Sequence, residues 1–113
     1  MKIKTGTLPN LENSRKFLDG SNRSFVKLNS SFIGLGTYKP GWQWSLHAGK
    51  QTGKSSESHI GYIVSGTMTV KDSEGNEKII NPGDAFEVGP NHDAWVSGKE
   101  ACIALDFTHI QNN

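Results

Sequence analysis

The feature that most constrains this chain is how often turn-forming residues interrupt it. The sequence holds 13 glycines in 113 residues, about 11% against a usual value of roughly 7%. Beyond residue 20, no window carries apolar residues at i, i+3, i+4 and i+7 without an intervening Gly or Pro. Long amphipathic helices are therefore excluded. Short apolar runs between turns predict an all-β fold, an antiparallel sandwich or barrel.

The turn signals also set the expected strand boundaries. Ser65-Gly66 has the composition of a tight hairpin, and Asn81-Pro82-Gly83-Asp84 suits a turn with proline second and glycine third. We expect strands at residues 23–28, 32–38, 43–47, 61–64, 67–71, 77–80, 85–88, 94–96 and 102–107. A chain of 113 residues supports one core. We expect an irregular N-terminal arm at 1–22, a barrel at 23–108 and a tail at 109–113.

Composition limits the classes of partner. Lys plus Arg is 12 and Asp plus Glu is 11, a net charge of +1, which removes the main electrostatic reason to expect nucleic acid or an anionic membrane. No apolar run approaches the roughly 18 residues of a membrane span, and the first residues lack the apolar stretch of a secretory signal. The single cysteine, Cys102, cannot form an internal disulfide. A cytoplasmic protein without nucleic-acid or membrane partners is expected.

Residues 42–47 alternate large apolar side chains with polar ones and end in His47. In one interpretation Trp42 and Trp44 fill the core and His47 is solvated. In the other, His47 faces a polar cavity and the tryptophans pack against another sheet or subunit. The tryptophans are expected mainly to pack, although an aromatic ring at a barrel mouth can stack on a planar ligand. The polar stretch 48–58 that follows is expected to be a surface loop or the lip of a pocket.

The order of turns from His59 onward resembles the cupin family. A strand runs from His59 to the Ser65-Gly66 hairpin, and a second strand and a loop with Gly75 follow. Next come the Pro82-Gly83-Asp84 turn, another strand and a Gly/Pro turn just before His92. The resemblance covers residues 40–107, and the segments 41–47 and 92–96 look like a subgroup of small single-domain cupins of undefined function. It implies a double-stranded β-helix, or jelly-roll barrel, with one open end for a metal or ligand.

The cupin metal motifs are altered in this chain. Anchoring the first motif on Gly66 puts His59 where the family has its Glu ligand, and the family's histidine pair falls on non-histidine residues. Anchoring the second motif on Gly83 leaves His92 two residues early, an even offset that preserves strand parity. The resemblance then implies a divalent transition metal (Zn, Fe, Ni or Mn) held by His47, His59 and His92. The alternative is that these are surface or hydrogen-bonded core histidines.

Several other residues have a functional and a structural interpretation. Glu57 is a candidate fourth ligand or base, against a solvated loop charge. Asp93 is a candidate to orient an imidazole, against a turn residue that binds its own backbone. Tyr62 is expected in the core or an interface. Cys102 is expected to be an inert small hydrophobe, and His109 a solvated histidine.

The function expected from the resemblance is a small-molecule-binding cupin that coordinates a divalent metal, with dioxygenase, isomerase or decarboxylase activity. The first alternative is a metal-free ligand-binding or sensing cupin, and the second a structural dimer with a relict pocket. The resemblance also implies a homodimer. Residues 1–38 and the Trp42/Trp44 face are the parts expected to be covered.

Overall fold

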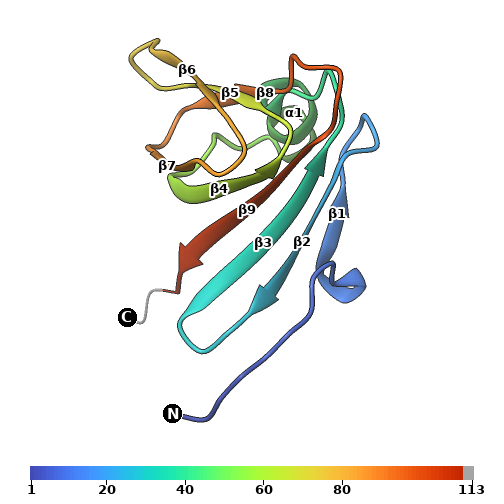
Figure 1. The fold of residues 1–113 in the computed structure, drawn as a ribbon, viewed down its shortest axis with the longest axis vertical. Helices are drawn as coiled ribbons and strands as arrows, with labels where there is room; N and C mark the ends of the chain where they lie inside the picture. Colours follow the sequence, from blue (N-terminus) through green and yellow to red (C-terminus); the bar gives the residue numbers. More distant parts are fainter. Residues whose placement is uncertain (111–113) are drawn as a thin grey trace.

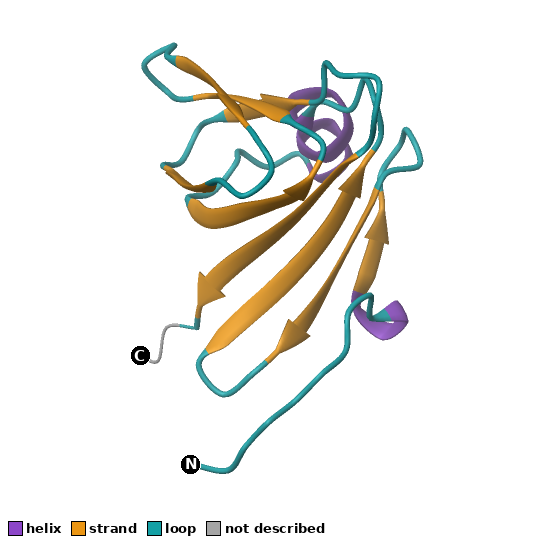
Figure 2. Cartoon of the chain, viewed as in Figure 1, coloured by secondary structure: helices purple, strands orange, loops and turns teal. Residues whose placement is uncertain are grey.

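Two antiparallel sheets form the body of the protein, seen in a computed structural model that describes residues 1–110. One sheet has six strands in the order β1-β2-β3-β9-β4-β7, and the other has three in the order β6-β5-β8. Strands dominate the described chain, with short helical turns between them (Figures 1 and 2). The strands are β1 Ser14–Lys16, β2 Asn22–Lys27, β3 Ser31–Tyr38, β4 His59–Ser65, β5 Met68–Lys71, β6 Glu77–Ile80, β7 Ala85–Val88, β8 Asp93–Trp95 and β9 Cys102–His109. The helical turns are η1 Leu11–Asn13, η2 Trp44–Gly49 and α1 Lys50–Thr52.

The larger sheet is organised around β9, which lies between β3 and β4. The last strand thereby joins an early strand to a middle one, the crossing of chain segments that a jelly roll requires. The β3–β9 register pairs Tyr38 with Cys102 and Phe32 with Thr108. Along both strands alternate residues face the interior of the barrel, among them Tyr38, Cys102 and Ala104.

The core lies between the two sheets. Both sheets contribute side chains to it, and Ile63 on β4 and Cys102 on β9 are fully buried. The buried cluster consists of Phe17, Tyr38, Trp42, Ala48, Ile63, Met68, Val70, Ile80, Val88, Ala94, Val96, Cys102 and Ala104. These strands bury one face each, as the alternation predicts, and the all-β, cupin-type fold expected from the sequence is confirmed.

The strand predicted at residues 43–47 is wrong. The chain is extended only at Gln43, which forms an isolated bridge with Trp95, and then winds into the π-helical turn η2. The carboxylate of Asp93 accepts hydrogen bonds from the backbone N–H and the hydroxyl of Ser45 at 3.0 and 2.8 Å. The ring of His47 accepts the N–H of Gln43 at 3.0 Å. These side-chain bonds to the backbone take the place of a strand ladder.

The arm and the tail also differ from expectation. Residues 14–16, expected to be irregular, form β1, which pairs with β2 through Ser14↔Ser24 and Lys16↔Asn22. All three residues of β1 are exposed, so this strand carries no apolar alternation that a sequence could reveal. At the other end β9 continues to His109. The N–H of Ile110 donates to the backbone oxygen of Ser30, and the last three residues of the predicted tail, 111–113, lie outside the described residues.

Among residues 1–110, no helical segment has the length and apolar character needed to cross a bilayer.

Candidate functional site

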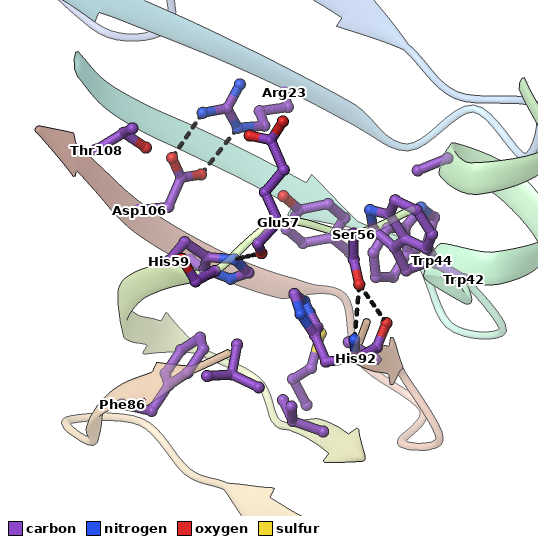
Figure 3. A pocket seen from close by; sticks show the side chains of 18 of the residues that line it. Arg23, Trp42, Trp44, Ser56, Glu57, His59, Phe86, His92, Asp106 and Thr108 are labelled. Atoms are coloured by element: carbon purple, nitrogen blue, oxygen red, sulfur yellow. Dashed lines mark hydrogen bonds and ion pairs between the residues drawn. The ribbon is translucent and has the colours of Figure 1, made fainter. Parts of the chain in front are cut away.

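A cavity of about 340 Å³ lies between the two sheets. Residues of the larger sheet, such as Arg23 and Asp106, and residues of the smaller one, such as Val70 and Ala94, line it together. The volume falls at the lower end of the range for small-molecule pockets, roughly 300–1,000 Å³. Several labelled side chains of its lining are drawn in Figure 3.

Two glycines on the inner face of β3 make room for this cavity. A Cβ at Gly36 would collide with the ring of Tyr38, and one at Gly34 would collide with the paired side chains of Arg23 and Asp106. The missing side chains leave room for the Tyr38 ring and for the ion pair, and these residues line the cavity.

One end of the cavity is aromatic. Tyr38 and Trp42 have ring centroids 4.4 Å apart, and Phe17 lies 6.2 Å from Tyr38 and 5.9 Å from Trp42. Trp44, from the turn η2, also lines the cavity and is half-buried. Burial raises the pKa of Tyr38, so its hydroxyl stays protonated at neutral pH. This end offers ring faces to a ligand.

The other part of the wall carries two imidazoles. The rings of His59, at the start of β4, and His92, just before β8, have centroids 4.9 Å apart at an angle of 61°. Both line the cavity (Figure 3). His59 and His92 come from segments 33 residues apart in sequence, and the barrel topology brings together these two of the three histidines that were expected to share a site.

The protonation state of His92 follows from its surroundings. Its Nδ1 atom lies 2.9 Å from the backbone oxygen of Gly89. Because a carbonyl oxygen only accepts, Nδ1 carries the hydrogen, and Nε2 of the neutral ring keeps its lone pair. Burial lowers the pKa of His92, and the nearby His59 lowers it further, while the Gly89 carbonyl opposes the shift. At neutral pH the cavity therefore contains an uncharged imidazole that can accept a proton or a hydrogen bond.

The loop 53–58 is fixed to the barrel by Ser56, which is 5% exposed. The Ser56 hydroxyl donates to the backbone oxygen of His92 at 2.6 Å and accepts from its N–H at 2.7 Å. The backbone N–H of Asn91 donates to the Ser56 carbonyl at 3.0 Å. Of the polar stretch 48–58, expected to be a surface loop or the lip of a pocket, residues 48–52 are helical, in η2 and α1. Residues 54–58 line the cavity as its lip, and Ser56 holds His92 in place.

An ion pair forms part of the wall. Arg23 on β2 donates to both carboxylate oxygens of Asp106 on β9, at 2.8 and 2.6 Å, across the intervening β3. The hydrogen bond to Asp106 raises the pKa of Arg23 against the opposing effect of burial. Because each charge is already neutralised by the other, this pair adds shape and polarity to the cavity and little net charge.

His47 does not join the other two predicted ligands. It belongs to η2, it is absent from the cavity lining, and its Nδ1 accepts the Gln43 N–H. Of the two interpretations of residues 42–47, the structure supports core tryptophans: Trp42 is 3% exposed. Both tryptophans line the protein's own cavity, Trp42 buried and Trp44 half-buried; that a second subunit covers this face stays a prediction.

Asp93 does not orient an imidazole. Its carboxylate accepts from Gln43 Nε2 at 2.7 Å, from the backbone N–H and hydroxyl of Ser45, and from the Ala94 N–H at 2.9 Å. These hydrogen bonds lower the pKa of Asp93 although its partial burial, the largest single influence, acts to raise it. Asp93 is therefore a structural residue that anchors η2, and through η2 it positions Trp44.

The remaining candidates are placed as follows. Glu57 is exposed and lines the cavity, and its backbone oxygen lies 3.4 Å from Nδ1 of His59. Cys102 is fully buried, and burial raises its pKa to about 11, which confirms an inert thiol. His109 is exposed at the end of β9.

The donor side chains of the protein decide whether a resident metal ion fits. A tightly held ion needs at least three protein ligands. Among residues 1–110, no three His, Cys, Asp or Glu side chains gather so that they could hold a metal. His59 and His92 supply two imidazoles and His47 lies elsewhere, so the residues present do not fit the predicted three-histidine site for zinc, iron, nickel or manganese.

Sequence reasoning missed Arg23, Ser56 and Asp106. The ion pair joins residues 83 positions apart, and Ser56 binds a residue 36 positions away. Nothing in the local pattern marks such partners. A usable signal did exist for Asp106, which is a charged residue on the inward-facing side of a predicted strand and therefore needs a partner.

Comparison with known proteins assigns the chain to a family. The family model described as "EutQ-like cupin domain" matches residues 41–101 of this sequence. The structure is similar to KdgF from Halomonas sp. (TM-score 0.64, 20% identity, 96% of this chain and 97% of that one). It is also similar to an RmlC-like cupin from Shewanella frigidimarina (TM-score 0.62, 18% identity, 96% and 95%). A third likeness is a cupin-superfamily sugar phosphate isomerase from Silicibacter pomeroyi (TM-score 0.66, 13% identity, 88% and 71%). At these low sequence identities, the structural likeness shows a shared fold and nothing more.

A partial match to curated proteins adds little to this. The cAMP-activated global transcriptional regulator CRP of Salmonella typhimurium is 35% identical over 62% of this chain. The chain spans 43% of the length of that relative. The family match covers more than half of the chain and agrees with the barrel and its central cavity. The chain therefore belongs to the EutQ-like cupin domain family, and it is a small cupin with a cavity between its two sheets.

Proposed function

We propose that this cupin binds a small molecule in its central cavity through His59 and His92, without a resident metal ion. The observation that carries the proposal is the pair of imidazoles 4.9 Å apart in the wall of a 340 Å³ cavity. The Nδ1–H of His92 is engaged by Gly89, which leaves its Nε2 free as an acceptor. The donor set therefore favours the metal-free alternative over the metal-coordinating one.

The chemistry available to this pair is acid–base. A neutral imidazole with a lowered pKa accepts a proton from a bound hydroxyl or from an acidic carbon. The His59 ring, which lies next to the His92 ring, can form a hydrogen bond with a neighbouring atom of the ligand. A solved relative is named a sugar phosphate isomerase, and proton transfer by an uncharged base suits that kind of reaction. Binding is the core of the proposal, and catalysis by His92 is its extension.

We also propose that the protein acts as a homodimer through the outer face of the larger sheet. Ile60, Tyr62 and Val64 alternate on β4 and are all exposed, and Phe107 on β9, the register partner of Ile60, is exposed beside them. These four outward positions carry no charge. Two copies can therefore meet there without opposing like charges, and an exposed apolar patch of this kind marks an interaction surface.

A binding screen with matched variants tests the function. Thermal unfolding is followed with a panel of sugars, sugar acids, sugar phosphates and small aromatic carbonyl compounds, for wild type and His92→Asn. Asparagine can keep a donor near the Gly89 oxygen and lacks Nε2. A specific ligand should raise the melting temperature of wild type by mass action and fail to do so for His92→Asn, while the exposed-residue control His109→Gln behaves like wild type. Equal stabilisation of all three proteins would contradict the proposal.

A further inference from the structure

The chain has two arginines, Arg15 and Arg23, and the fold places them opposite each other. They are register partners on the antiparallel strands β1 and β2, so their side chains leave the sheet on the same face, with Cβ atoms about 4.5–5.5 Å apart. Both line the central cavity. Like charges directly opposite each other destabilise a strand pair. Two guanidiniums kept in this position therefore need a counter-charge in the cavity.

Asp106 supplies only part of that counter-charge. Its carboxylate accepts from Nε and Nη2 of Arg23 at 2.8 and 2.6 Å (Figure 3). This is the one ion pair among residues 1–110, so Arg15 has no carboxylate partner in that part of the chain. Nη1 of Arg23 has no acceptor there either, and the only buried side-chain atom without a partner in the same residues is Nε1 of Trp42. Nη1 of Arg23 is therefore accessible, and together with the exposed Arg15 it offers N–H donors to a ligand.

Contacts of the fold hold both arginines at the cavity. All three residues of β1 are exposed, so this strand brings nothing apolar to the core, and what it adds to the cavity wall is Arg15. Nε2 of Gln51 in α1 donates to the backbone oxygen of Lys16 at 3.1 Å, which ties β1 to the helical turn that precedes the lip. A Cβ at Gly34 would collide with Nη2 of Arg23, so the glycine leaves space for that guanidinium. The positions of both guanidiniums are thus built into the fold.

The charged residues of the lining indicate the charge of the ligand. Three of them are cations, Arg15, Arg23 and Lys54, and two are anions, Glu57 and Asp106. Counted without the histidines, one positive charge is left over. One carboxylate balances it, whereas a phosphate monoester carries nearly two negative charges at neutral pH. A carboxylate also matches a guanidinium in shape, because both are planar and can form two parallel hydrogen bonds.

The histidines add a second requirement. The Nδ1–H of His92 is engaged by the Gly89 carbonyl, which leaves Nε2 as an acceptor. Nε2 of His92 is not a buried atom without a partner, so a ligand can reach it. The group that suits this acceptor is a hydroxyl, which donates. A molecule that carries both a carboxylate and a hydroxyl is a hydroxy acid, and the cavity of about 340 Å³ has room for a small one.

We propose that the cavity takes a small hydroxy acid. Its carboxylate binds Arg15 and Nη1 of Arg23, and its hydroxyl donates to Nε2 of His92. This inference rests on the proposed function, because it names the ligand class of the same site. The arginine pair sets it apart from binding of a neutral sugar, and the single surplus charge sets it apart from binding of a sugar phosphate.

The experiment compares hydroxy acids with their neutral amides on the full chain. The probes are glycolate, lactate, glycerate and D-gluconate, which differ in how far their hydroxyls lie from the carboxylate, and dissociation constants come from titrations followed in ¹⁵N–¹H spectra. At least one acid should bind at least fivefold more tightly than its amide. Arg15→Gln should weaken that binding at least fivefold, and Arg15→Lys, which keeps the charge and loses the planar fork, should fall between. Lys16→Gln is the matched control, since Lys16 is the next exposed cation on β1 and points to the opposite face.

Two results would overturn this inference. The first is that no acid of the panel binds wild type at millimolar concentration. The second is an acid whose amide binds equally well, or whose affinity Arg15→Gln leaves unchanged. If His92→Asn abolishes that second kind of binding, the proposed function stands while the carboxylate class fails. Arg15 is exposed on a strand at the edge of its sheet, so Arg15→Gln removes no buried contact and its loss of binding does not reflect a loss of fold.

Discussion

The hydroxyl of Ser56 binds both backbone groups of His92, with distances of 2.6 Å to its carbonyl oxygen and 2.7 Å to its N–H. A single side chain thereby attaches the loop 53–58 to the residue just before β8, whose imidazole lines the cavity. The polar loop is held in place by this buried contact, since its own residues bring no apolar side chain to the core.

Replacing Ser56 by alanine should destabilise the protein measurably. The substitution leaves the buried N–H of His92 without its acceptor, a loss of about 1–3 kcal/mol in the free energy of unfolding. Urea denaturation measures it. Ser55→Ala is the control, because Ser55 is exposed in the same loop. Equal stability of the two variants would show that the Ser56–His92 contact contributes nothing.

Stability should fall in acid through His92. Burial lowers the pKa of His92 below its ordinary value of 6.5, with His59 adding to the effect and Gly89 and Asp93 opposing it. As the pH falls through 6.5, His92 is protonated in the unfolded chain but stays neutral in the folded chain until a lower pH is reached. The unfolded state therefore binds more protons between these two pKa values. The free energy of unfolding should decrease as pH falls from about 7 through 6.5 and below.

The variant His92→Asn isolates that contribution. Denaturation curves between pH 7.5 and 5 should show a weaker pH dependence for His92→Asn than for wild type, whereas His109→Gln should follow wild type, because His109 is exposed. Parallel pH profiles for wild type and His92→Asn would mean that the buried imidazole titrates no differently in the folded and unfolded states.

The pair of Arg23 and Asp106 should show a modest coupling energy. Both side chains are partly exposed, at 32% and 17%, and pairs of this kind are worth about 0.5–1 kcal/mol. A double-mutant cycle of Arg23→Gln and Asp106→Asn, read by denaturation, should give this value and lose part of it at high salt. Additive effects of the two substitutions would mean that the bidentate contact is not maintained in solution.

The strands could be predicted well because local turn residues determine where each strand ends. Gly66, the Pro82-Gly83 turn and the polar loop around Gly75 each end a strand by their own backbone preferences. The left-handed φ of 72° at Gly66 and 89° at Gly83 confirms that these turns use glycine for its conformational freedom.

The turn η2 could not be predicted in this way. Its alternating residues are typical of a strand, but Asp93, 48 residues from Ser45, supplies the carboxylate that satisfies the backbone of a helical turn. The same limit applies to the site. The parity argument for His92 required that its strand had begun, but β8 begins at Asp93. His92 lines the cavity from the turn before that strand, and His47 is kept away from it by η2.

The proposed dimer should depend on Tyr62. Placing a charge in the middle of the exposed apolar face, with Tyr62→Glu, should convert a dimer into a monomer when mass is measured by light scattering on a sizing column. Ile79→Glu is the control: Ile79 is also exposed and apolar, but it lies on β6 in the other sheet. Loss of the dimer in Ile79→Glu alone, or a monomeric wild type, would rule out the face of β4 and β9 as the interface.

The central claim, a histidine-lined pocket that works without a resident metal, is tested most directly by elemental analysis of untagged protein purified without chelators. Within residues 1–110, His59 and His92 are the only converging donors, so the account predicts well below one equivalent of zinc, iron, nickel or manganese. Near one equivalent of a transition metal, falling in His59→Ala and unchanged in His47→Ala, would contradict it.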